Sequence, residues 1–320
     1  MLKTDVVGVD WQSEQLHGGT LGDVRLISGT AETFGGEKLP YKLVLKTQKQ
    51  WARHGDPDSW RREYDLYLSE LGEAFGDGLR WPVCYRAEMS GDGDETRIWM
   101  EHLGGAWGSA LSVDMCERAA EQLGRFQGKL FAEQPAFLAR LTNLSDVNYV
   151  KEHYLHYSSW LMVRDYIRAE DCEIPTHLCE MLIALDEHRD EIFRRIDALP
   201  IVLCHRDFWV ANLFCDEDEI VLIDWDTAGW GRLGEDIASL IADEADVEHM
   251  LECYHRCIPA YYRGFSARAD TPPITEHCVR ELILMLFGYR IVEWYLDAQS
   301  PEQKALQLDT LEKIYEMKEM

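Results

Sequence analysis

The sequence predicts an α+β chain with a small, strand-rich part at residues 1–103 and a larger, mainly helical part at residues 104–320. Short apolar stretches separated by glycine-containing or acidic turns dominate the first part, as is typical of antiparallel strands. In the second part, apolar residues recur at helical spacing over long segments. The 320 residues are enough for two domains, each with its own hydrophobic core.

The charge of the chain argues against two classes of partner. A net charge of −26 would repel the phosphates of nucleic acids and anionic membrane surfaces, so we expect neither as a partner. Residues 1–103 contain 12 basic and 18 acidic residues, whereas residues 104–320 contain 20 and 40. This acidic surplus would attract a cationic ligand to the second part, although it also simply keeps a protein soluble.

The cysteines and apolar stretches predict a cytoplasmic protein. The nine cysteines form no Cys-x-x-Cys pair and accompany no histidine cluster suited to zinc, so free thiols in a reducing compartment are expected. The first residues contain no long apolar region, and the most apolar stretch, residues 282–287, is too short to cross a bilayer. The oligomeric state is left open.

Two features of the first part are suited to binding phosphates. Gly18 and Gly19 form a turn that would let backbone N–H groups approach a phosphate, although such a turn is also an ordinary hairpin. Lys46 ends an apolar strand at residues 41–46, as expected for a lysine that reaches inward. A helix is expected from Asp58 or Ser59 to about residue 70. Glu63 lies early in this helix, where it could pair with a cation or could simply be a solvated surface charge.

The remaining elements follow from spacing and capping signals. Strands are expected at residues 80–88 and 97–102, followed by a boundary at Gly104 and Gly105. Ser112 is placed to cap a helix at residues 113–130. Further helices are expected at residues 148–168, 177–197, 246–263, 275–297 and 301–319.

Residues 202–226 combine several polar side chains with two apolar runs. Asp207 follows His205 and Arg206, and Asn212 lies five positions later. Strands at residues 213–215 and 220–223 would form a hairpin that returns Asp224 to the edge where Asn212 lies. One carboxamide and two carboxylates suit a hard cation such as Mg²⁺, which takes its other ligands from water and substrate phosphates. The segment therefore predicts phosphoryl transfer.

This spacing resembles the catalytic segment shared by protein kinases and the aminoglycoside phosphotransferase/choline kinase family. The resemblance implies a bilobal, protein-kinase-like fold with an N-terminal nucleotide-binding lobe at residues 1–103 and a C-terminal catalytic and substrate-binding lobe at residues 104–320. It also implies that Asp207 orients or deprotonates the attacking hydroxyl, while Asn212 and Asp224 hold Mg²⁺.

The same resemblance implies roles for residues outside this segment. Lys46 and Glu63 match the ion pair of strand lysine and helix glutamate that supports the nucleotide phosphates. The nucleotide whose phosphates Lys46 binds is expected to be ATP, and GTP is the alternative. The base of this nucleotide would bind a hinge at Met100, Glu101 and Leu103.

Four other residues are expected to support the site or contact the acceptor. His205 and Asp236 are expected to brace the catalytic loop. Trp209 and Asp226 are possible substrate contacts, although Trp209 could instead pack in the core and Asp226 could be a solvated acid.

Two departures from the kinase pattern narrow the function. Asp224 begins Asp-Trp-Asp rather than Asp-Phe-Gly, and Arg206 stands where the small-molecule branch commonly has glycine. No Ala-Pro-Glu motif follows, and only a short run separates Asp224 from Asp236, which disfavours a protein kinase. The resemblance thus implies an enzyme that phosphorylates a hydroxyl of a small molecule, and the acidic surplus of residues 104–320 favours a cationic, aminoglycoside-like acceptor.

Other functions stay open at this stage. The acceptor could instead be choline, homoserine or a sugar amine, and a choline-type acceptor would require an aromatic cage. A pseudokinase that only binds nucleotide is disfavoured, because Lys46, Asp207, Asn212 and Asp224 are all present. Acidic candidates for the acceptor pocket are Glu152, Asp165, Glu170, Asp171 and Glu293, and aromatic candidates are Tyr149, Tyr154, Tyr157, Trp160, Tyr166, Trp294 and Tyr295.

Overall fold

The computed structural model describes residues 5–16, 22–51, 53, 56–76, 78–216, 219–244, 246–271 and 274–317. The chain divides into two compact units. Unit 1 comprises Met1–Gly105, Ala136–Leu144 and Phe214–Thr227, and unit 2 comprises Ala106–Pro135, Ser145–Leu213 and Ala228–Met320. Two segments that follow residue 103 in the sequence, residues 136–144 and 214–227, therefore belong to unit 1.

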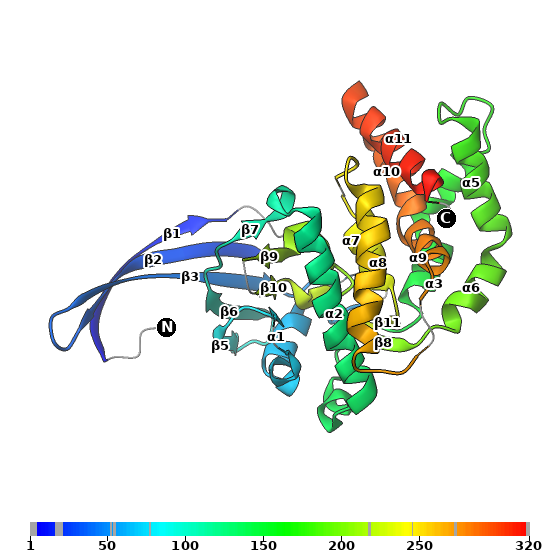
Figure 1. Ribbon diagram of the computed structural model, residues 1–320. Coiled ribbons are helices and arrows are strands. Elements are labelled where there is room, and N and C mark those ends of the chain that lie inside the picture. Colours follow the sequence, from blue (N-terminus) through cyan, green and yellow to red (C-terminus); the bar gives the residue numbers. More distant parts are fainter. Residues whose placement is uncertain are drawn as a thin grey trace. The chain divides into compact units, whose positions relative to one another are not determined.

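Unit 1 is built on an antiparallel sheet. Among the described residues, five strands pair in the order β1-β2-β3-β6-β5 (Figure 1). Their bounds are Val6–Gln15 for β1, Asp23–Thr33 for β2, Lys38–Lys49 for β3, Cys84–Met89 for β5 and Glu95–Glu101 for β6. Lys46 lies in the middle of this sheet, opposite Val24 of β2 and Ile98 of β6.

A short helix and a second set of strands complete unit 1. The helix α1 (Arg62–Tyr67) is shorter than predicted, because residues 59–61 form a 3-10 turn and residue 68 ends the helix. The predicted strands on either side of the acidic turn are present as β9 (Leu213–Cys215) and β10 (Ile220–Leu222), and β10 runs parallel to β4 (Leu79–Arg80). The side chains of Trp60, Leu66 and Trp225 are buried in the core of this unit.

Unit 2 is mainly helical. Its helices are α2 (Val113–Glu133), α3 (Tyr149–His156), α4 (Ser158–Tyr166), α5 (Thr176–Glu187), α6 (Arg189–Asp197), α7 (Glu235–Ala242), α8 (Met250–Ser266), α9 (Glu276–Ile283), α10 (Tyr289–Asp297) and α11 (Pro301–Glu316). Its short strands are β7 (Ala106–Trp107), β8 (Ile201–Cys204) and β11 (Gly229–Arg232). Strands β8 and β11 pair antiparallel, which brings the start of α7 beside the loop that follows Cys204.

Helices α2 and α8 pack side by side at close range (Figure 1). A Cβ atom added to Gly264 of α8 would lie 2.0 Å from the carbonyl oxygen of Glu121, and one added to Gly124 of α2 would lie 2.1 Å from that of Tyr261. Glycine is needed at both positions because the two backbones touch there. The predicted cap of α2 is present, since the Ser112 side chain accepts a hydrogen bond from the N–H of Met115.

Two predicted helices are each divided in the structure. The prediction of one helix at residues 148–168 is wrong, because Tyr157 has an extended backbone with φ −67° and ψ 120° between α3 and α4. The prediction of one helix at residues 177–197 is also wrong, because His188, with ψ 8°, separates α5 from α6. Both breaks change the direction of the backbone without a proline or glycine, so no residue in the sequence marked them.

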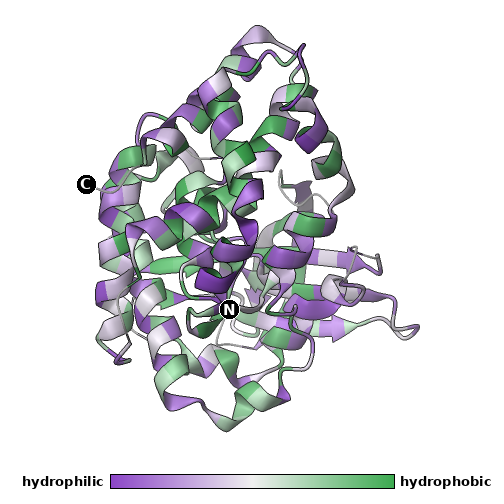
Figure 2. Cartoon of the chain, turned by 90° about the vertical axis from the view of Figure 1, so that its right-hand side faces the viewer, coloured by the Kyte–Doolittle hydropathy of each residue, from purple (hydrophilic) through white to green (hydrophobic). Residues whose placement is uncertain are grey.

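The predicted helix at residues 275–297 is continuous but not uniform. A π-helical turn at residues 284–288 lies between α9 and α10; such turns often accompany functional sites. Figure 2 shows hydrophobic and hydrophilic segments alternating along most helices, as expected when each helix buries one face. None of the described helices is long and apolar enough to cross a bilayer.

Candidate active site

Unit 1 gathers three of the predicted site residues around one ammonium group. The Nζ atom of Lys46 donates hydrogen bonds to Glu63 Oε2 at 2.6 Å and to Asp224 Oδ1 at 2.5 Å. The Glu63 side chain is only 2% exposed, so the reading of Glu63 as a solvated charge is wrong. The predicted ion pair between Lys46 and Glu63 is confirmed, and Asp224 is a further partner.

Burial and charge oppose each other in this cluster. Burial lowers the pKa of Lys46, but the charges of Asp224 and Glu63 outweigh this effect and raise the pKa above its usual value. Burial raises the pKa of Glu63, although Lys46 opposes the change. Lys46 therefore stays positive at any physiological pH, which suits a group that binds phosphates.

The Asp-Trp-Asp segment is anchored on both sides of Asp224. Asp224 has a φ of +63°, a left-handed conformation that is uncommon for a residue other than glycine and often occurs at functional sites. The next residue, Trp225, is buried against Phe75 and Trp81, with ring centroids 5.7 and 6.0 Å away. Tryptophan fills this aromatic cluster, which accounts for its presence in the motif.

Arg62 is a supporting residue that the sequence did not reveal. Its side chain is 1% exposed and donates hydrogen bonds to the carbonyl oxygens of Asp226 at 2.7 Å and Asn143 at 2.8 Å, and to Asp56 Oδ1 at 2.6 Å. Arg62 thus connects the helix that carries Glu63 to the segment that carries Asp224. Two of its three partners, Asn143 and Asp226, are 81 and 164 residues away, too distant in sequence for a local pattern to predict them.

Unit 2 places Asp207 and Asn212 in direct contact. The Asn212 amide nitrogen donates to Asp207 Oδ2 at 2.7 Å and to the Asp207 carbonyl oxygen at 2.8 Å. Both bonds use nitrogen, so the amide oxygen is the atom of Asn212 that can bind a cation. His205 is 1% exposed, and its Nδ1 accepts a hydrogen bond from the Asp207 N–H at 3.3 Å. This burial agrees with the structural role expected for His205.

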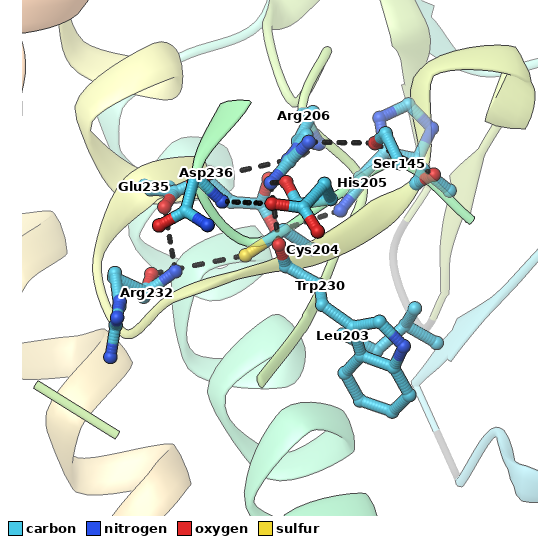
Figure 3. Close-up of polar contacts among 12 residues, drawn as sticks. Ser145, Leu203, Cys204, His205, Arg206, Trp230, Arg232, Glu235 and Asp236 are labelled. Carbon is cyan, nitrogen blue, oxygen red and sulfur yellow. Dashed lines mark hydrogen bonds and ion pairs between the residues drawn. The ribbon is translucent and has the colours of Figure 1, made fainter. Parts of the chain in front are cut away.

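Asp236 connects this loop to the core of unit 2. Its Oδ2 accepts hydrogen bonds from the His205 N–H at 3.0 Å and from Gln127 Nε2 at 2.8 Å, and its Oδ1 accepts from the Arg206 N–H at 2.7 Å (Figure 3). Gln127 Oε1 in turn accepts a hydrogen bond from the Tyr261 hydroxyl. Burial raises the pKa of Asp236 to about 6, although the N–H donors of Arg206 and His205 oppose the shift. Asp236 therefore lies where a brace of the catalytic loop is expected.

Other predicted site residues lie in different surroundings. Gly18 and Gly19 fall outside the described residues. Met100 and Glu101 end β6, and the Glu101 N–H donates to the Val83 carbonyl at 3.0 Å while its carboxylate pairs with Arg80. A base at this hinge would therefore have to use other backbone groups, such as those near Leu103.

The two possible substrate contacts also have defined positions. Trp209 is half-buried, and its backbone N–H donates to the Asp207 carbonyl at 3.2 Å. Asp226 is 8% exposed, so the reading of Asp226 as a solvated acid is wrong. Burial, and then the charge of Asp224, raise the pKa of Asp226.

The donor chemistry fits a hard cation bound together with a phosphate ligand. Among the described residues, no three His, Cys, Asp or Glu side chains are placed to hold a metal by themselves. Mg²⁺ commonly binds only one or two protein oxygens and takes its other ligands from phosphates and water. Asp224 in unit 1 and Asn212 in unit 2 each supply oxygen of the required kind.

A cavity of about 440 Å³ in unit 2 includes Asp207 in its wall. Helix α7 and its end contribute Glu235, Ser239 and Asp243, and the π-helical turn and α10 contribute Phe287, Arg290, Glu293, Trp294 and Asp297. The lining residues from α3, α4 and the break between these helices are Tyr149, Val150, His153, Tyr157 and Trp160, of which all but Val150 carry aromatic rings, and Arg206 lines the cavity next to Asp207. Of the acidic candidates from the sequence, only Glu293 lines this cavity, and Tyr154 and Tyr295 are buried elsewhere in the core.

Two carboxylates in the cavity wall are held at a cost in stability. Burial raises the pKa of Asp243 to about 6, although Arg290, whose Nη1 lies 3.8 Å from Asp243 Oδ1, opposes the shift. Burial raises the pKa of Glu235 to about 7 against the opposing charge of Arg206. Buried acids with such shifts are often retained for binding or catalysis rather than for stability.

Replacing Asp243 with asparagine is expected to stabilise the protein in a pH-dependent way. Because the folded-state pKa is raised, the wild-type protein loses stability as pH rises from about 4 through 6, by at most about 3 kcal/mol. Asparagine stays neutral, so the gain should be small at pH 4 and largest at pH 7. Urea unfolding at pH 4 and at pH 7 measures the change in the free energy of unfolding. Asp309→Asn, at an exposed position, is the control. A gain that does not change with pH would contradict the assignment of this shift to Asp243.

Comparison with known families shows one match over most of the chain. The sequence pattern described as the Phosphotransferase enzyme family (APH) matches residues 42–269. This range includes Lys46, Glu63, Asp207, Asn212 and Asp224. No protein among those with curated functions matches the sequence.

Several solved structures have the same fold at low sequence identity. A GDP and kanamycin complex of APH(2″)-IIIa matches with a TM-score of 0.62 and 14% identity, over 97% of this chain and 94% of the other. Choline kinase from Cryptosporidium parvum matches with a TM-score of 0.59 and 14% identity, over 96% of this chain and 89% of the other. A microcompartment-associated aminopropanol kinase matches with a TM-score of 0.58 and 16% identity, over 95% of this chain and 90% of the other. The predicted protein-kinase-like α+β fold is confirmed.

Proposed function

Because the chain belongs to the phosphotransferase enzyme family, we propose that it transfers the γ-phosphoryl group of ATP to a hydroxyl of a small, cationic, aminoglycoside-like molecule. The family membership makes it a small-molecule phosphotransferase that acts on hydroxyl groups. The proposal adds the donor, the charge of the acceptor and the residues that act on each.

The observation that carries the proposal is the composition of the cavity beside Asp207. Asp243, Glu293 and Asp297 line it together with Asp207. The two arginines that also line it are each paired with a lining carboxylate: Arg290 with Asp243 at 3.8 Å, and Arg206 with Glu235 at 3.6 Å. Carboxylates in a partly enclosed cavity attract ammonium groups more strongly than exposed carboxylates do, because water screens the enclosed charges less. An acceptor with amino groups is therefore favoured over a neutral sugar.

The small molecules named with the similar proteins support the same class. Kanamycin, aminopropanol and choline appear in the names of the three structures reported above, and each molecule combines a hydroxyl with a positively charged nitrogen. The cavity in this chain has room for a molecule larger than choline, which favours the aminoglycoside-like end of the range.

The nucleotide is assigned to residues of unit 1. Lys46 is kept positive by Glu63 and Asp224, so it is prepared to bind the phosphates. Asp224 and Asn212 are the residues proposed to bind Mg²⁺, which would offset negative charge on the phosphoryl group during transfer. The base is assigned to the segment from Met100 to Leu103. ATP is the proposed donor, and GTP is the alternative, since GDP is present in the APH(2″)-IIIa structure.

The acceptor hydroxyl is assigned to Asp207. The carboxylate would accept the hydroxyl proton and hold the hydroxyl oxygen in line with the phosphoryl group. It would increase the rate of transfer mainly by positioning this oxygen and by its negative charge. Asn212 donates to Asp207 Oδ2 at 2.7 Å. Asp236 accepts hydrogen bonds from the N–H groups of His205 and Arg206, and His205 Nδ1 accepts one from the Asp207 N–H. Each of these contacts limits the movement of the Asp207 side chain.

The aromatic wall of the cavity favours a second candidate, a kinase of choline or another amino alcohol. The His153 ring stacks with the rings of Tyr157 and Tyr149, with centroid distances of 4.4 and 5.7 Å. The Trp160 ring meets it edge-on at 4.6 Å. Ring faces bind quaternary ammonium groups through cation–π attraction. The carboxylates of α7 and α10 are not needed for so small a ligand, which is why this candidate ranks second.

A panel of acceptors tests the proposal. The purified protein is incubated with ATP or GTP, Mg²⁺ and one acceptor at a time: aminoglycosides, choline, aminopropanol, homoserine and neutral sugars. Formation of the nucleoside diphosphate and the mass of the product are measured. We expect the highest kcat/KM with an aminoglycoside and ATP. Turnover of neutral sugars alone would overturn the assignment of a cationic acceptor, and phosphorylation of no hydroxyl compound would favour a nucleotide-binding pseudokinase.

A further inference from the structure

The residue before Asp207 has an unusual backbone conformation. Arg206 has a φ of +68°, in the left-handed region that glycine adopts freely and other residues rarely adopt. The same position is commonly glycine in the small-molecule branch that this segment resembles. A large side chain here is unfavourable for the backbone, so it requires compensation from contacts elsewhere.

The Arg206 side chain makes such contacts with three separate segments (Figure 3). Nη1 donates to Ser145 Oγ at 2.6 Å, and Nη2 donates to the carbonyl oxygens of Asp146 at 2.7 Å and Trp230 at 2.5 Å. Nε lies 3.6 Å from Glu235 Oε2 in an ion pair whose side chains are 4% and 3% exposed. All these partners belong to unit 2.

Two further contacts make the arginine rigid. Its guanidinium carbon lies 4.8 Å from the centre of the Tyr149 ring. Its backbone N–H donates to Asp236 Oδ1 at 2.7 Å. The residue is therefore held at its backbone and at the far end of its side chain, immediately before Asp207.

We propose that Arg206 is a positioning residue, which holds the left-handed turn of the catalytic loop and thereby aims the Asp207 carboxylate at the acceptor. A planar guanidinium that donates in several fixed directions can act as such a clamp, whereas glycine would allow the turn but leave it unanchored. The inference rests on the proposed function, because Asp207 matters only if it acts on the acceptor hydroxyl.

Two substitutions separate the clamp from the backbone conformation. Arg206→Gly keeps the left-handed turn accessible and removes every side-chain contact. Arg206→Lys keeps the charge but cannot reproduce the fork of donors. We expect kcat to fall about 100-fold in the glycine variant, as for a displacement of a catalytic group by about 1 Å, and about tenfold in the lysine variant. The KM for the nucleotide should change less than about twofold, because Lys46 and Asp224 belong to unit 1.

Arg164→Lys is the matched control. Arg164 of α4 is also in unit 2, and its side chain is 11% exposed; its guanidinium carbon lies 4.8 Å from the Tyr154 ring centroid, and its Nε pairs with Asp186 Oδ1 at 3.2 Å. It is not among the residues that line the cavity around Asp207. Its replacement should lower the unfolding temperature about as much as Arg206→Lys does, while kcat stays near the wild-type value.

The Asp207→Asn variant distinguishes failure of this inference from failure of the proposed function. If Asp207→Asn lowers kcat by roughly 10²–10⁴-fold and both Arg206 variants lower kcat, the double variant Asp207→Asn/Arg206→Lys should be no slower than Asp207→Asn alone. Wild-type kcat in both Arg206 variants, or an equal loss of kcat in Arg164→Lys, would overturn the positioning role alone. Normal turnover in Asp207→Asn would overturn both the role of Asp207 and the inference.

Discussion

Replacing Asp207 with asparagine is expected to lower kcat by roughly 10²–10⁴-fold, the usual contribution of a positioned general base. Asparagine has nearly the same shape, and its side-chain oxygen can still accept the hydrogen bond that Asn212 donates at 2.7 Å. The loop should therefore keep its structure while it loses the group that accepts a proton. The rate of nucleoside diphosphate formation with the best acceptor of the panel measures the effect.

The control for this prediction is Asp190→Asn on α6. Asp190 is an exposed acid in the same unit, so the substitution removes one negative charge without changing the cavity. Its kcat should match that of the wild type. If Asp207→Asn keeps more than about a tenth of the wild-type kcat, another residue must act on the acceptor hydroxyl.

Replacing Asp224 with asparagine is expected to abolish the effect of Mg²⁺ on nucleotide binding and to lower turnover by at least about 100-fold. The carboxylate is the charged oxygen donor proposed for the metal, and a neutral amide binds Mg²⁺ much more weakly. Asparagine tolerates a φ of +63° better than most residues, so the fold should persist. Glu63, which accepts a hydrogen bond from Lys46 at 2.6 Å in the wild type, should still hold Lys46 in this variant.

Calorimetric titration of ATP with and without Mg²⁺ tests this prediction. In the wild type, Mg²⁺ should tighten binding, and in Asp224→Asn the two titrations should coincide. Asp65→Asn is a suitable control, because Asp65 is another carboxylate of unit 1 that pairs with a cation, Arg61, at 2.9 Å. A retained Mg²⁺ effect in Asp224→Asn would contradict the role of Asp224 as a metal ligand.

The parts of the site that depend on neighbours in the sequence were predictable. Asp207 and Asn212 are five residues apart, and a single 3-10 turn at residues 210–212 brings them into contact. The two short strands before Asp224 were predictable in the same way, from apolar runs bounded by an acidic turn. In both cases the chain between the residues is too short to allow many alternative arrangements.

The partnership of Lys46 and Glu63 required more than local spacing. The two residues lie on a strand and a helix, and their pairing was expected only because the order of motifs resembled a known family. The structure confirmed the pair at 2.6 Å and added Asp224 as a second partner. Burial of Glu63 could not be judged from a short helix whose charged residues all looked alike in the sequence.

Two arginines show what the sequence could not reveal. Arg62 and Arg206 are among the most polar side chains, so composition predicts that they are exposed. Both are instead buried, because backbone carbonyls and carboxylates from distant segments surround them. Arg206 could be recognised as a departure from a glycine position, but the contacts that make it rigid come from segments about 25 to 60 residues away.

The sequence by itself determined the fold class and the chemistry, since both depend on the order and spacing of a few motifs along the chain. Only the tertiary structure decided which side chains surround Asp207. Its cavity is lined from α3, α4, α7 and α10, and most acidic candidates chosen by residue type, such as Glu152 and Asp165, are not in its wall. The reason is physical: catalytic groups are tied to a short loop, whereas a cavity is formed by helices whose facing sides are set by the packing of the whole unit.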